Sequence, residues 1–435
     1  MIAKLQTYPK YKESGLEWLS QIPSGWTTTK LFELYVRKKE YSDNDEELLS
    51  VYRDHGVIPK SSRDDNHNKP SEDLSNYLLV KPNNLVINKM KAWQGSVAVS
   101  RYRGIVSPAY FTYKLRKIAN GKIFLPYLHH LLRSSAYIET YKRISTGIRP
   151  AQWDLDPYQF KILLVLLPPY ETQRCIADFL DEKTKIIDEL VAKKEKMIQL
   201  LREKRAALIT STVTKGLDPK ARMKPSGIDW LGDIPEGWEV TELHREVIFQ
   251  NGHGFPNEIQ GRDEDEFPFM KVSDINGEQI NISSARNYVS DFEVKSRGWN
   301  KIPAGSVLTA KIGAALAVNH RKINDIECII DNNMLAFILR KKSWLHPKYF
   351  FMLSKSFDLN WFVNPGAVPS VNMFQLKELI IPVPKKEKQK QITDFLDVET
   401  VKIDKIVAFI KSQIDQLKEY RLSLIYSVVT GKVKV

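Results

Sequence analysis

Basic and amide side chains alternate with aromatic ones in two short stretches of the first half of the chain. Arginine can hydrogen-bond guanine with two bonds, glutamine can do the same with adenine, and lysine anchors phosphate groups. We therefore predict that these side chains contact DNA; they are Lys89, Lys91, Trp93, Gln94, Arg101, Arg103, Arg149, Gln152 and Trp153. For each of them, a solvated surface charge or a core tryptophan is the alternative interpretation.

The second half of the chain contains a second set of side chains of the same kinds. Lys311, Asn319, His320, Arg321 and Asn372 lie between its strand-like segments. We predict DNA contacts for this set as well, through amide readout of bases and cationic anchoring of phosphates.

Two other patterns resemble catalytic sites, but neither indicates one. Leu167-Pro168-Pro169-Tyr170 echoes the signature of amino-methyltransferases, yet Leu167 replaces the polar residue that must hydrogen-bond the target amine, which favours a strand-to-helix turn. Glu293, Val294 and Lys295, with Asp274 upstream, have the residue types of a metal-dependent nuclease, but this spacing arises readily by chance in a chain rich in Asp, Glu and Lys.

Sites for cofactors are not indicated by the sequence. There is no Walker A motif and no glycine-rich loop within a strand-loop-helix unit, since Gly252-His253-Gly254 lies among polar residues. His129 and His130 are adjacent, and adjacent residues of a helix point to different sides, which makes a poor metal site.

Composition predicts a folded protein of more than one domain with a polyanionic partner. The 435 residues exceed one ordinary core, and the net charge is +13. The charge is unevenly distributed, with 22 Lys+Arg against 14 Asp+Glu over 27–168 and 16 against 17 over 239–384. Cys175 and Cys328 lack disulfide or zinc spacing, and we find neither a signal peptide nor a membrane span, so we expect a reducing cytoplasm and no membrane partner.

An internal duplication determines how these residues must be positioned. Residues 11–26 match 223–238 at nine of sixteen positions, and residues 171–188 match 387–404 at ten of eighteen. The two offsets, 212 and 216 residues, are nearly equal. The chain is therefore one unit written twice, which predicts internal pseudo-twofold symmetry.

Each copy ends in a long amphipathic helix. The stripe residues are spaced 4-3-4-3-4-3 in both copies: Ile187, Val191, Lys194, Ile198, Leu201, Arg205 and Leu208, then Ile403, Val407, Ile410, Ile414, Leu417, Arg421 and Leu424. A lone helix of this length cannot bury its stripe, so we expect the two copies to pair as an antiparallel coiled coil of roughly 60 Å. Packing against the core of a globular domain is the alternative for each stripe.

Short β-branched and aromatic runs, bounded by Gly, Pro and Asn, predict strands in the intervening stretches, and residues 124–144 predict a helix. The fold class is therefore α+β, with two mixed α/β domains joined by two long antiparallel coiled-coil helices. The expected boundaries are a repeated element at 1–26, a domain at 27–168, a long helix at 169–216, a repeated linker at 217–238, a second domain at 239–384 and a second long helix at 385–435. By this symmetry, residues 1–26 should lie beside the end of the second helix.

This order of elements resembles the specificity subunit of type I restriction-modification systems, over essentially the whole chain. Residues 88–95 (NKMKAWQG) and 104–110 (GIVSPAY) are similar to a segment common in the target recognition domains of that family. The second half departs from this segment, with TAKIG at 309–313 and DNN at 331–333, which implies a different half-site.

The resemblance implies a protein without catalytic activity that reads a bipartite DNA site. Its implied partners are double-stranded DNA, two modification subunits that use S-adenosylmethionine, and restriction subunits that use ATP and Mg; none of these cofactors is expected in this chain. The repeated elements, with Trp18, Trp26, Trp230 and Trp238, would bind the modification subunits or cap the coiled coil by apolar packing. The alternatives are a coiled-coil DNA-binding regulator without enzyme partners and an autonomous nuclease or methyltransferase.

Overall fold

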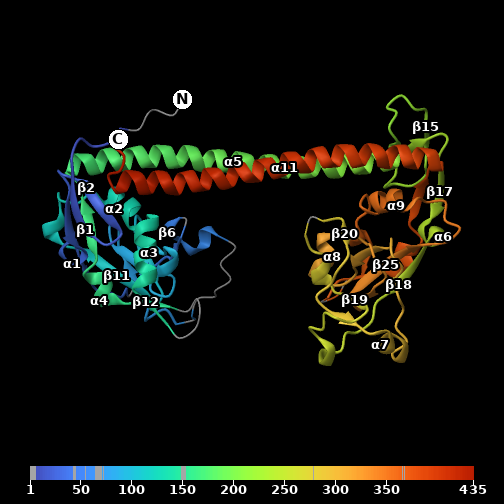
Figure 1. Ribbon diagram of the computed structural model, residues 1–435, viewed down its shortest axis with the longest axis horizontal. Helices are drawn as coiled ribbons and strands as arrows, with labels where there is room; N and C mark the ends of the chain where they lie inside the picture. Colours follow the sequence, from blue (N-terminus) through green and yellow to red (C-terminus); the bar gives the residue numbers. More distant parts are fainter. Residues whose placement is uncertain are drawn as a thin grey trace. The chain divides into compact units, whose positions relative to one another are not determined.

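The computed structural model describes residues 6–42, 46–53, 55–63, 71, 73–147, 153–277, 279–364, 366 and 368–435. The chain divides into two compact units (Figure 1). Unit 1 consists of Met1–Glu195 and Lys411–Val435, and unit 2 consists of Lys196–Ile410. Two long helices, α5 (Tyr170–Lys215) and α11 (Lys386–Val429), each run from one unit into the other.

Unit 1 contains a central antiparallel sheet with the strand order β4-β11-β8-β9. Its strands are β4 (Tyr35–Arg37), β8 (Leu85–Asn88), β9 (Val97–Val99) and β11 (Tyr110–Leu115). Five two-stranded ladders surround it: β1 (Tyr11–Leu16) with β2 (Leu19–Pro23), β3 (Thr27–Lys30) with β14 (Leu164–Leu167), β5 (Leu49–Tyr52) with β6 (Gly56–Pro59), β7 (Leu78–Val80) with β10 (Gly104–Val106), and β12 (Ser145–Thr146) with β13 (Asp154–Leu155).

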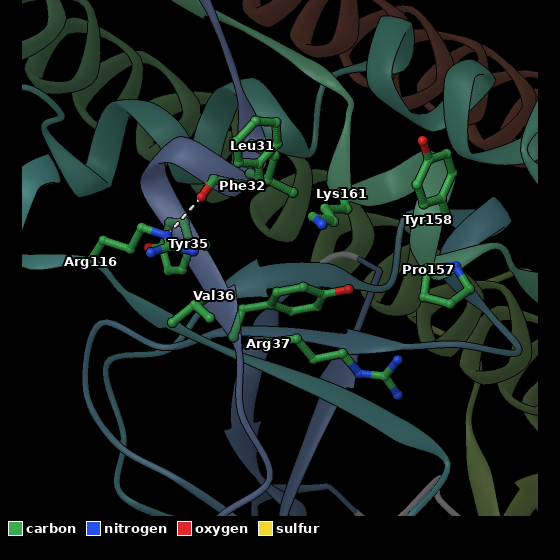
Figure 2. Close-up of a pocket in the computed structure, with 10 residues that line it drawn as sticks. Leu31, Phe32, Tyr35, Val36, Arg37, Arg116, Pro157, Tyr158 and Lys161 are labelled. Carbon is green, nitrogen blue, oxygen red and sulfur yellow. Dashed lines mark hydrogen bonds between the residues drawn. The ribbon is translucent and has the colours of Figure 1, made fainter.

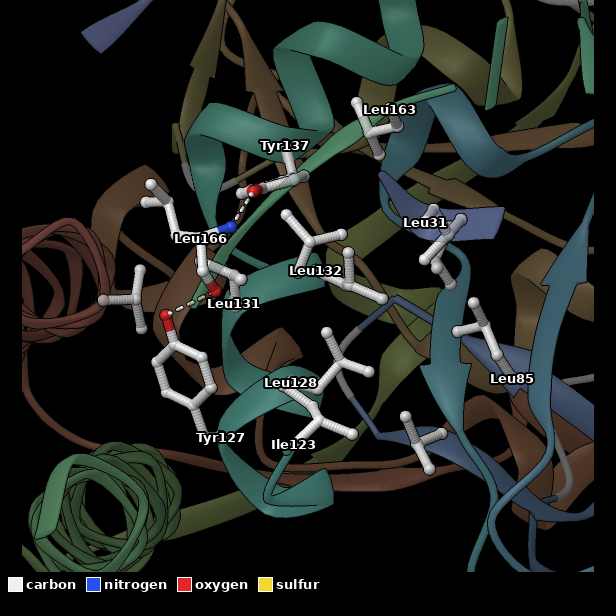
Figure 3. Close-up of a cluster of buried hydrophobic side chains, with 14 of the residues drawn as sticks. Leu31, Leu85, Ile123, Tyr127, Leu128, Leu131, Leu132, Tyr137, Leu163 and Leu166 are labelled. Carbon is white, nitrogen blue, oxygen red and sulfur yellow. Dashed lines mark hydrogen bonds between the residues drawn. The ribbon is translucent and has the colours of Figure 1, made fainter. Parts of the chain in front are cut away.

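The helices of unit 1 pack on this sheet through apolar side chains (Figure 3). They are α1 (Leu31–Leu34), α2 (Leu125–Leu132), α3 (Ser135–Arg143) and α4 (Pro157–Lys161). Two buried tyrosines connect α2 and α3 to β14, because the Tyr127 hydroxyl donates to the Leu166 carbonyl (3.2 Å) and the Leu166 amide donates to the Tyr137 hydroxyl (3.3 Å).

The single helix predicted over 124–144 is in fact two helices. Ser134 lies between α2 and α3 with extended backbone angles, φ −69° and ψ 154°, and its hydroxyl donates to the Leu131 carbonyl. An extended residue cannot continue the helical hydrogen-bond ladder, so the first helix ends before Ser134 and a new one begins after it.

Unit 2 repeats this plan with a larger sheet, in the strand order β18-β25-β22-β23-β20. These strands are β18 (Val247–Asn251), β20 (Asn281–Ile282), β22 (Val307–Ala310), β23 (Lys322–Asn324) and β25 (Met334–Leu339). The remaining strands are β15 (Met223–Pro225), β16 (Asp233–Pro235), β17 (Glu239–Glu242), β19 (Phe267–Met270), β21 (Tyr288–Val289), β24 (Ile329–Ile330), β26 (Val363–Asn364), β27 (Ser370–Val371) and β28 (Ile380–Val383). Its shorter helices are α6 (Leu243–Glu246), α7 (Asp291–Ser296), α8 (Ala314–Val318), α9 (Pro347–Ser354) and α10 (Met373–Lys377).

The two long helices run antiparallel inside each unit. In unit 1, Arg421 Nε lies 2.9 Å from Asp188 Oδ1; in unit 2, Arg205 Nε lies 3.2 Å from Asp404 Oδ1. Each of these four residues is the repeat counterpart of one in the other pair, since 216 residues separate Asp188 from Asp404 and Arg205 from Arg421. The arginine of each helix therefore pairs with the aspartate of the other helix, as a symmetric antiparallel pair requires.

A buried glutamine repeats at the base of each long helix. Gln173 accepts from the Phe124 amide and donates to two carbonyls of unit 1. Gln389 accepts from the His346 amide and donates to two carbonyls of unit 2. Both glutamines are fully buried. The predicted fold class, two mixed α/β units joined by two long antiparallel helices, is confirmed.

Candidate nucleic-acid interface

Lys89 and Lys311 occupy equivalent backbone positions in the two units. Lys89 follows β8, its amide donates to the Ala109 carbonyl, and its carbonyl accepts from the Leu155 amide (3.2 and 3.0 Å). Lys311 follows β22, its amide donates to the Asn333 carbonyl, and its carbonyl accepts from the Val371 amide (2.9 and 3.0 Å). Both lysines directly follow a central strand and make the same two backbone hydrogen bonds, so they occupy the same position in the fold of each unit.

The side chains of these two lysines have different polar partners. The Lys89 ammonium lies 3.4 Å from the Asp154 carboxylate, at a partly exposed position. The Lys311 ammonium donates to Asn251 Oδ1 (2.7 Å), and burial lowers the pKa of Lys311 below its ordinary value. The equivalent position of the fold therefore has a carboxylate neighbour in unit 1 and an amide neighbour in unit 2.

In unit 1 the structure brings several predicted DNA-binding residues together around a short turn. Trp93 and Trp153 lie with ring centroids 5.2 Å apart, although 60 residues separate them. The Trp93 indole donates to the Met90 carbonyl (3.1 Å), which fixes the turn, and Lys91 and Gln94 are exposed on it. We call this group the unit 1 cluster: Lys89, Lys91, Trp93, Gln94 and Trp153.

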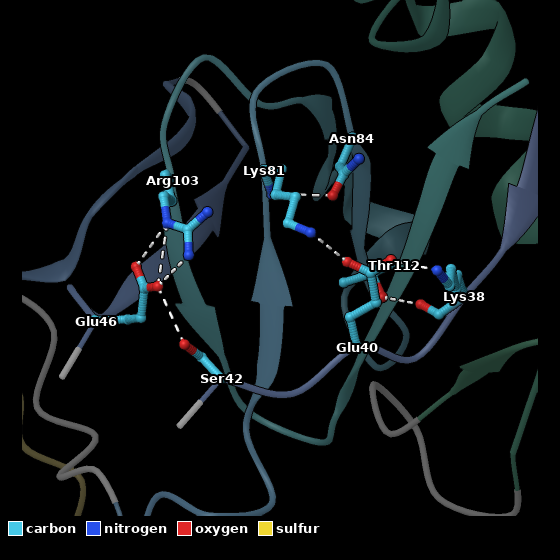
Figure 4. Close-up of polar contacts among 8 residues, drawn as sticks. All are labelled: Lys38, Glu40, Ser42, Glu46, Lys81, Asn84, Arg103 and Thr112. Atoms are coloured by element: carbon cyan, nitrogen blue, oxygen red, sulfur yellow. Dashed lines mark hydrogen bonds and ion pairs between the residues drawn. The ribbon is translucent and has the colours of Figure 1, made fainter. Parts of the chain in front are cut away.

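Arg101 and Arg103 lie apart from the unit 1 cluster, in acidic surroundings. Arg103 is held by Glu46, with Nη2 2.6 Å from Oε1 (Figure 4). Arg101 lines an open hollow on α5 together with Asp181, Asp188 and Glu189. Arg149 and Gln152 lie outside the described residues.

A second ion-pair group lies next to Arg103 in Figure 4. Glu40 lies between Lys38 and Lys81, and the hydrogen bonds from these two ammonium groups lower the pKa of Glu40 to about 2. These charges satisfy one another within the unit and are not part of the unit 1 cluster.

In unit 2 the structure contradicts part of the predicted DNA-binding set. Arg321 is only 4% exposed and donates to Thr309 Oγ1 and to the His320 carbonyl, and burial lowers its pKa to about 9. A guanidinium buried in this way cannot reach a DNA backbone, so the prediction for Arg321 is wrong for this conformation.

Asn319 and Asn372 have structural tasks. Asn319 has left-handed backbone angles, and its Oδ1 accepts from the Leu359 amide. Asn372 caps α10, because its Oδ1 accepts from the Phe374 and Gln375 amides. Their amides are therefore already occupied in the described structure.

One partner of Lys311, Asn251, could not be recognised from the sequence. Asn251 ends β18, and β18, β25 and β22 are adjacent strands, which brings Asn251 beside Lys311 although 60 residues separate them. His253 follows, stacked on Trp299 with centroids 6.0 Å apart at an interplanar angle of 22°. Only the strand pairing reveals that Asn251 lies beside Lys311, and no local sequence pattern marks it.

The repeated tryptophans have structural roles in the described chain. Trp26 is 1% exposed and Trp238 is 6% exposed. A Cβ on Gly431, just after α11, would lie 3.1 Å from the Trp26 ring, and one on Gly216, just after α5, would lie 3.3 Å from the Trp238 ring. Capping of the helix ends by apolar packing is thus seen for Trp26 and Trp238, and their burial contradicts direct binding of a partner through these two rings.

Trp18 and Trp230 are half-buried and make different contacts. The Trp18 ring packs edge-on against Tyr137, with centroids 5.4 Å apart. The Trp230 indole donates to the Ile380 carbonyl of β28 (3.1 Å). The expected contact of the N-terminal element with the second long helix is seen in the Tyr11 hydroxyl, which donates to the Gly431 carbonyl (3.1 Å).

The catalytic look-alikes are all accounted for by local structure. Leu167 ends β14 and Tyr170 begins α5, so the Leu-Pro-Pro-Tyr segment is a strand-to-helix turn. Glu293 forms a capping box with Ser290, and Asp274 accepts from the Lys271 amide, so these carboxylates act in separate turns.

Neither a metal cluster nor a membrane-spanning helix is found in the part of the chain that the structure describes. No cluster of three or more His, Cys, Asp or Glu side chains suited to a metal ion occurs there. Among the same residues, no helix combines the length and the apolar character needed to cross a membrane.

Comparison with known proteins gives consistent results. Residues 235–419 match the family model of the type I restriction modification DNA specificity domain. The chain is 23% identical to the type I restriction enzyme MjaVIII specificity subunit of Methanocaldococcus jannaschii, over 98% of this chain and 97% of that protein. It is 22% identical to the EcoBI specificity subunit of Escherichia coli, over 62% and 58% of the two chains. A solved chain from work on complex assembly and conformational transition of the type I R-M system has a similar fold, with a TM-score of 0.71 at 14% identity over 95% of this chain and 99% of that one.

Proposed function

The chain belongs to the family of type I restriction-modification specificity subunits, and on this premise we propose that unit 1 and unit 2 each read one half of a bipartite DNA site. The observation that carries the proposal is the equivalence of Lys89 and Lys311. One scaffold position holds a cation in both units, whereas the neighbouring side chains differ. Such an arrangement suits a common phosphate anchor beside two different base-reading surfaces.

In unit 1, the unit 1 cluster supplies the chemistry of the first half-site. Lys89 and Lys91 neutralise phosphates, and the exposed Gln94 has an amide that can hydrogen-bond adenine through two atoms. The packed pair of Trp93 and Trp153 fixes the turn that presents these side chains. In unit 2, Lys311 has the anchoring role, and Asn251 lies close enough to take part in reading.

The partners of this non-catalytic subunit are two modification subunits that methylate adenine and restriction subunits that cleave DNA, in a prokaryotic cytoplasm. S-adenosylmethionine, ATP and Mg act in those subunits. Exposed apolar side chains on each long helix support docking of helical partner segments, in place of the buried tryptophans. They are Ile186 and Leu190 in unit 1 and Met197, Leu200, Phe395, Val398, Val401, Ile406 and Phe409 in unit 2, and all are at least 38% exposed.

The test is DNA binding by the assembled modification complex that contains Lys89→Ala, Lys311→Ala or both. A lysine that neutralises one phosphate contributes about one unit to the slope of log K against log salt concentration. Each single variant should therefore bind more weakly and lower the slope by about one, and the double variant should lower it by about two.

Lys117→Ala is the matched control, because Lys117 is an exposed lysine outside the unit 1 cluster. Its affinity and salt slope should equal those of the unmodified complex. Unchanged affinity and slope for both Lys89→Ala and Lys311→Ala would contradict the anchoring role.

A further inference from the structure

A hollow of about 360 Å³ lies in unit 1 among α1, β4, the end of β11 and α4 (Figure 2). Pockets that hold small ligands begin at a volume of roughly 300 Å³. None of the unit 1 cluster residues lines it. The hollow is therefore separate from the candidate nucleic-acid interface.

The floor of the hollow is apolar except for one hydroxyl group. Leu31, Tyr35 and Tyr113 form it. The Tyr35 hydroxyl donates to the Asn83 carbonyl (3.2 Å), but the hydroxyl of Tyr113, a residue only 4% exposed, has no hydrogen-bond partner among the residues that the structure describes. Burial raises the pKa of Tyr113 to about 12, so the hydroxyl keeps its proton at neutral pH. This hydroxyl is itself buried, so it is an unsatisfied donor just beneath the surface of the floor, in apolar surroundings.

Three cationic side chains surround this floor, and each belongs to a different element. The Arg37 guanidinium lies 4.0 Å above the Phe111 ring, Arg116 Nε donates to the Phe32 carbonyl (2.7 Å), and the Lys161 ammonium lies 5.6 Å from the Phe32 ring. Figure 2 shows Arg116 on one side of the hollow and Lys161 and Tyr158 on the other. All of the described lining residues are neutral or cationic, so the rim favours an anion.

We propose that this hollow binds a single nucleotide, with the base on the apolar floor and the phosphate at the cationic rim. A planar ring would lie over Tyr35 and Tyr113, whose side chains are almost fully buried, and a small shift of the floor on binding would let an acceptor atom on its edge reach the buried Tyr113 hydroxyl. Arg37, Arg116 and Lys161 supply the charge that a phosphate needs, and the 63%-exposed Tyr158 ring offers a stacking surface at the opening. The source of this nucleotide is either the free metabolite pool or an unpaired nucleotide of a strand.

Unit 2 provides an internal comparison for the proposal. In unit 1, Tyr113 of β11 pairs with Arg37 of β4; in unit 2, Phe337 of β25 pairs with Phe249 of β18. Arg340 repeats the bond of Arg116, because its Nε donates to the His244 carbonyl (3.1 Å). Unit 2 therefore lacks both the buried hydroxyl and one of the three cations, and we expect nucleotide binding in unit 1 alone.

The experiment is equilibrium dialysis of the full chain with radiolabelled AMP, GMP, CMP and UMP, with inorganic phosphate and with a single-stranded tetranucleotide. At least one mononucleotide or the tetranucleotide should bind saturably with one equivalent per chain. Tighter binding of the mononucleotide assigns a free metabolite, and tighter binding of the tetranucleotide assigns a strand. In both cases inorganic phosphate should bind more weakly.

Two variants install the residues of unit 2 into unit 1. Arg37→Phe removes a charged partner and should weaken binding at least about tenfold, and Tyr113→Phe removes one hydrogen bond and should weaken it about threefold to tenfold. Tyr113→Phe keeps the ring that packs on the floor, so the fold is retained. Arg340→Gln in unit 2 is the matched control and should leave binding unchanged. Absence of saturable binding by every nucleotide probe, or binding that neither unit 1 variant weakens, would overturn the proposal.

Discussion

Replacing Gln173 by leucine should destabilise unit 1 selectively. The Gln173 side chain accepts from the Phe124 amide (2.7 Å) and donates to the Lys122 and Pro168 carbonyls (3.0 and 2.8 Å), all at a fully buried position. Leucine has nearly the same size but satisfies none of these three backbone groups. The change therefore isolates the hydrogen bonds from the packing.

The magnitude follows from the number of bonds lost. A net contribution of about 0.5–1.5 kcal/mol for each hydrogen bond gives a loss of about 3 kcal/mol in the free energy of unfolding of unit 1. For a unit of about 220 residues, each kcal/mol lowers Tm by roughly 2–4 °C, so Tm should fall by roughly 6–12 °C. Gln389→Leu should have the same effect in unit 2, because Gln389 makes the equivalent bonds.

Thermal unfolding combined with hydrogen-deuterium exchange tests both the magnitude and the location. Gln173→Leu should accelerate amide exchange around 122–124, and Gln389→Leu should do so around 344–346, without the reverse effects. Gln199→Leu on the exposed face of α5 is the matched control and should change Tm by less than about 2 °C. A Tm unchanged by Gln173→Leu, or exchange that accelerates equally in both units, would refute the reasoning.

Three further predictions concern the helix ends, a surface charge group and the long helices. Gly431→Ala should lower Tm more than Gly216→Ala in thermal unfolding. Both residues have left-handed backbone angles, but the new Cβ would lie 2.5 Å from Pro23 Cδ at position 431 and 3.3 Å from the Trp238 ring at position 216. Equal losses of Tm would contradict this reasoning. The pKa of Glu40 in the folded state is about 2, below an unfolded value of about 4.3. The ionised carboxylate therefore contributes about 1 kcal/mol to the free energy of unfolding above pH 4.3, and this contribution is lost as the pH falls to 2. In urea unfolding, Glu40→Gln should be less stable than the unmodified chain at pH 5 and closer to it at pH 3, and a loss of stability independent of pH would argue against this. Insertion of one heptad into both α5 and α11, about 10 Å of helix, should lengthen the unspecified spacer of the DNA site by about 3 base pairs in methylation mapping; an unchanged spacer would exclude the coiled coil as the determinant of spacing.

Much of the fold could be predicted because the duplication is visible as sequence identity and the heptad spacing reflects the packing of one helix face. A stripe such as Ile403, Val407, Ile410 and Ile414 has to be buried, and a second matched stripe in the same chain is the nearest partner. The exchange of Asp188 and Asp404 between the two arginines follows from the same symmetry. These features depend on spacing alone, which sequence displays.

The equivalence of Lys89 and Lys311 could be predicted only in part. The two residues follow strands that periodicity identifies, but the surrounding sequences diverge, and the correspondence is visible only in backbone bonds to Leu155 and Val371. Backbone hydrogen bonds are largely indifferent to side-chain identity, so a scaffold can persist where sequence similarity has been lost.

The individual contacts could not be predicted because they depend on burial and strand register. The sequence around Arg321 does not distinguish it from an exposed arginine, yet its side chain is buried beside Thr309. Asn372 resembles a base-reading amide but is required as a helix cap. Asn251 approaches Lys311 only because three strands align. Residue type identifies possible chemistry, whereas tertiary packing decides which side chains remain free to perform it.

The most direct test of the central claim is a genome-wide map of N6-methyladenine by single-molecule sequencing in cells that express this chain together with a modification subunit that forms a complex with it. We expect a gapped two-part motif that disappears when the chain is deleted, and we expect Gln94→Ala to alter the recognition of one half of the motif only. Methylation that is absent although the complex forms, or that persists unchanged without the chain, would contradict the sequence-reading role and favour a DNA-binding regulator.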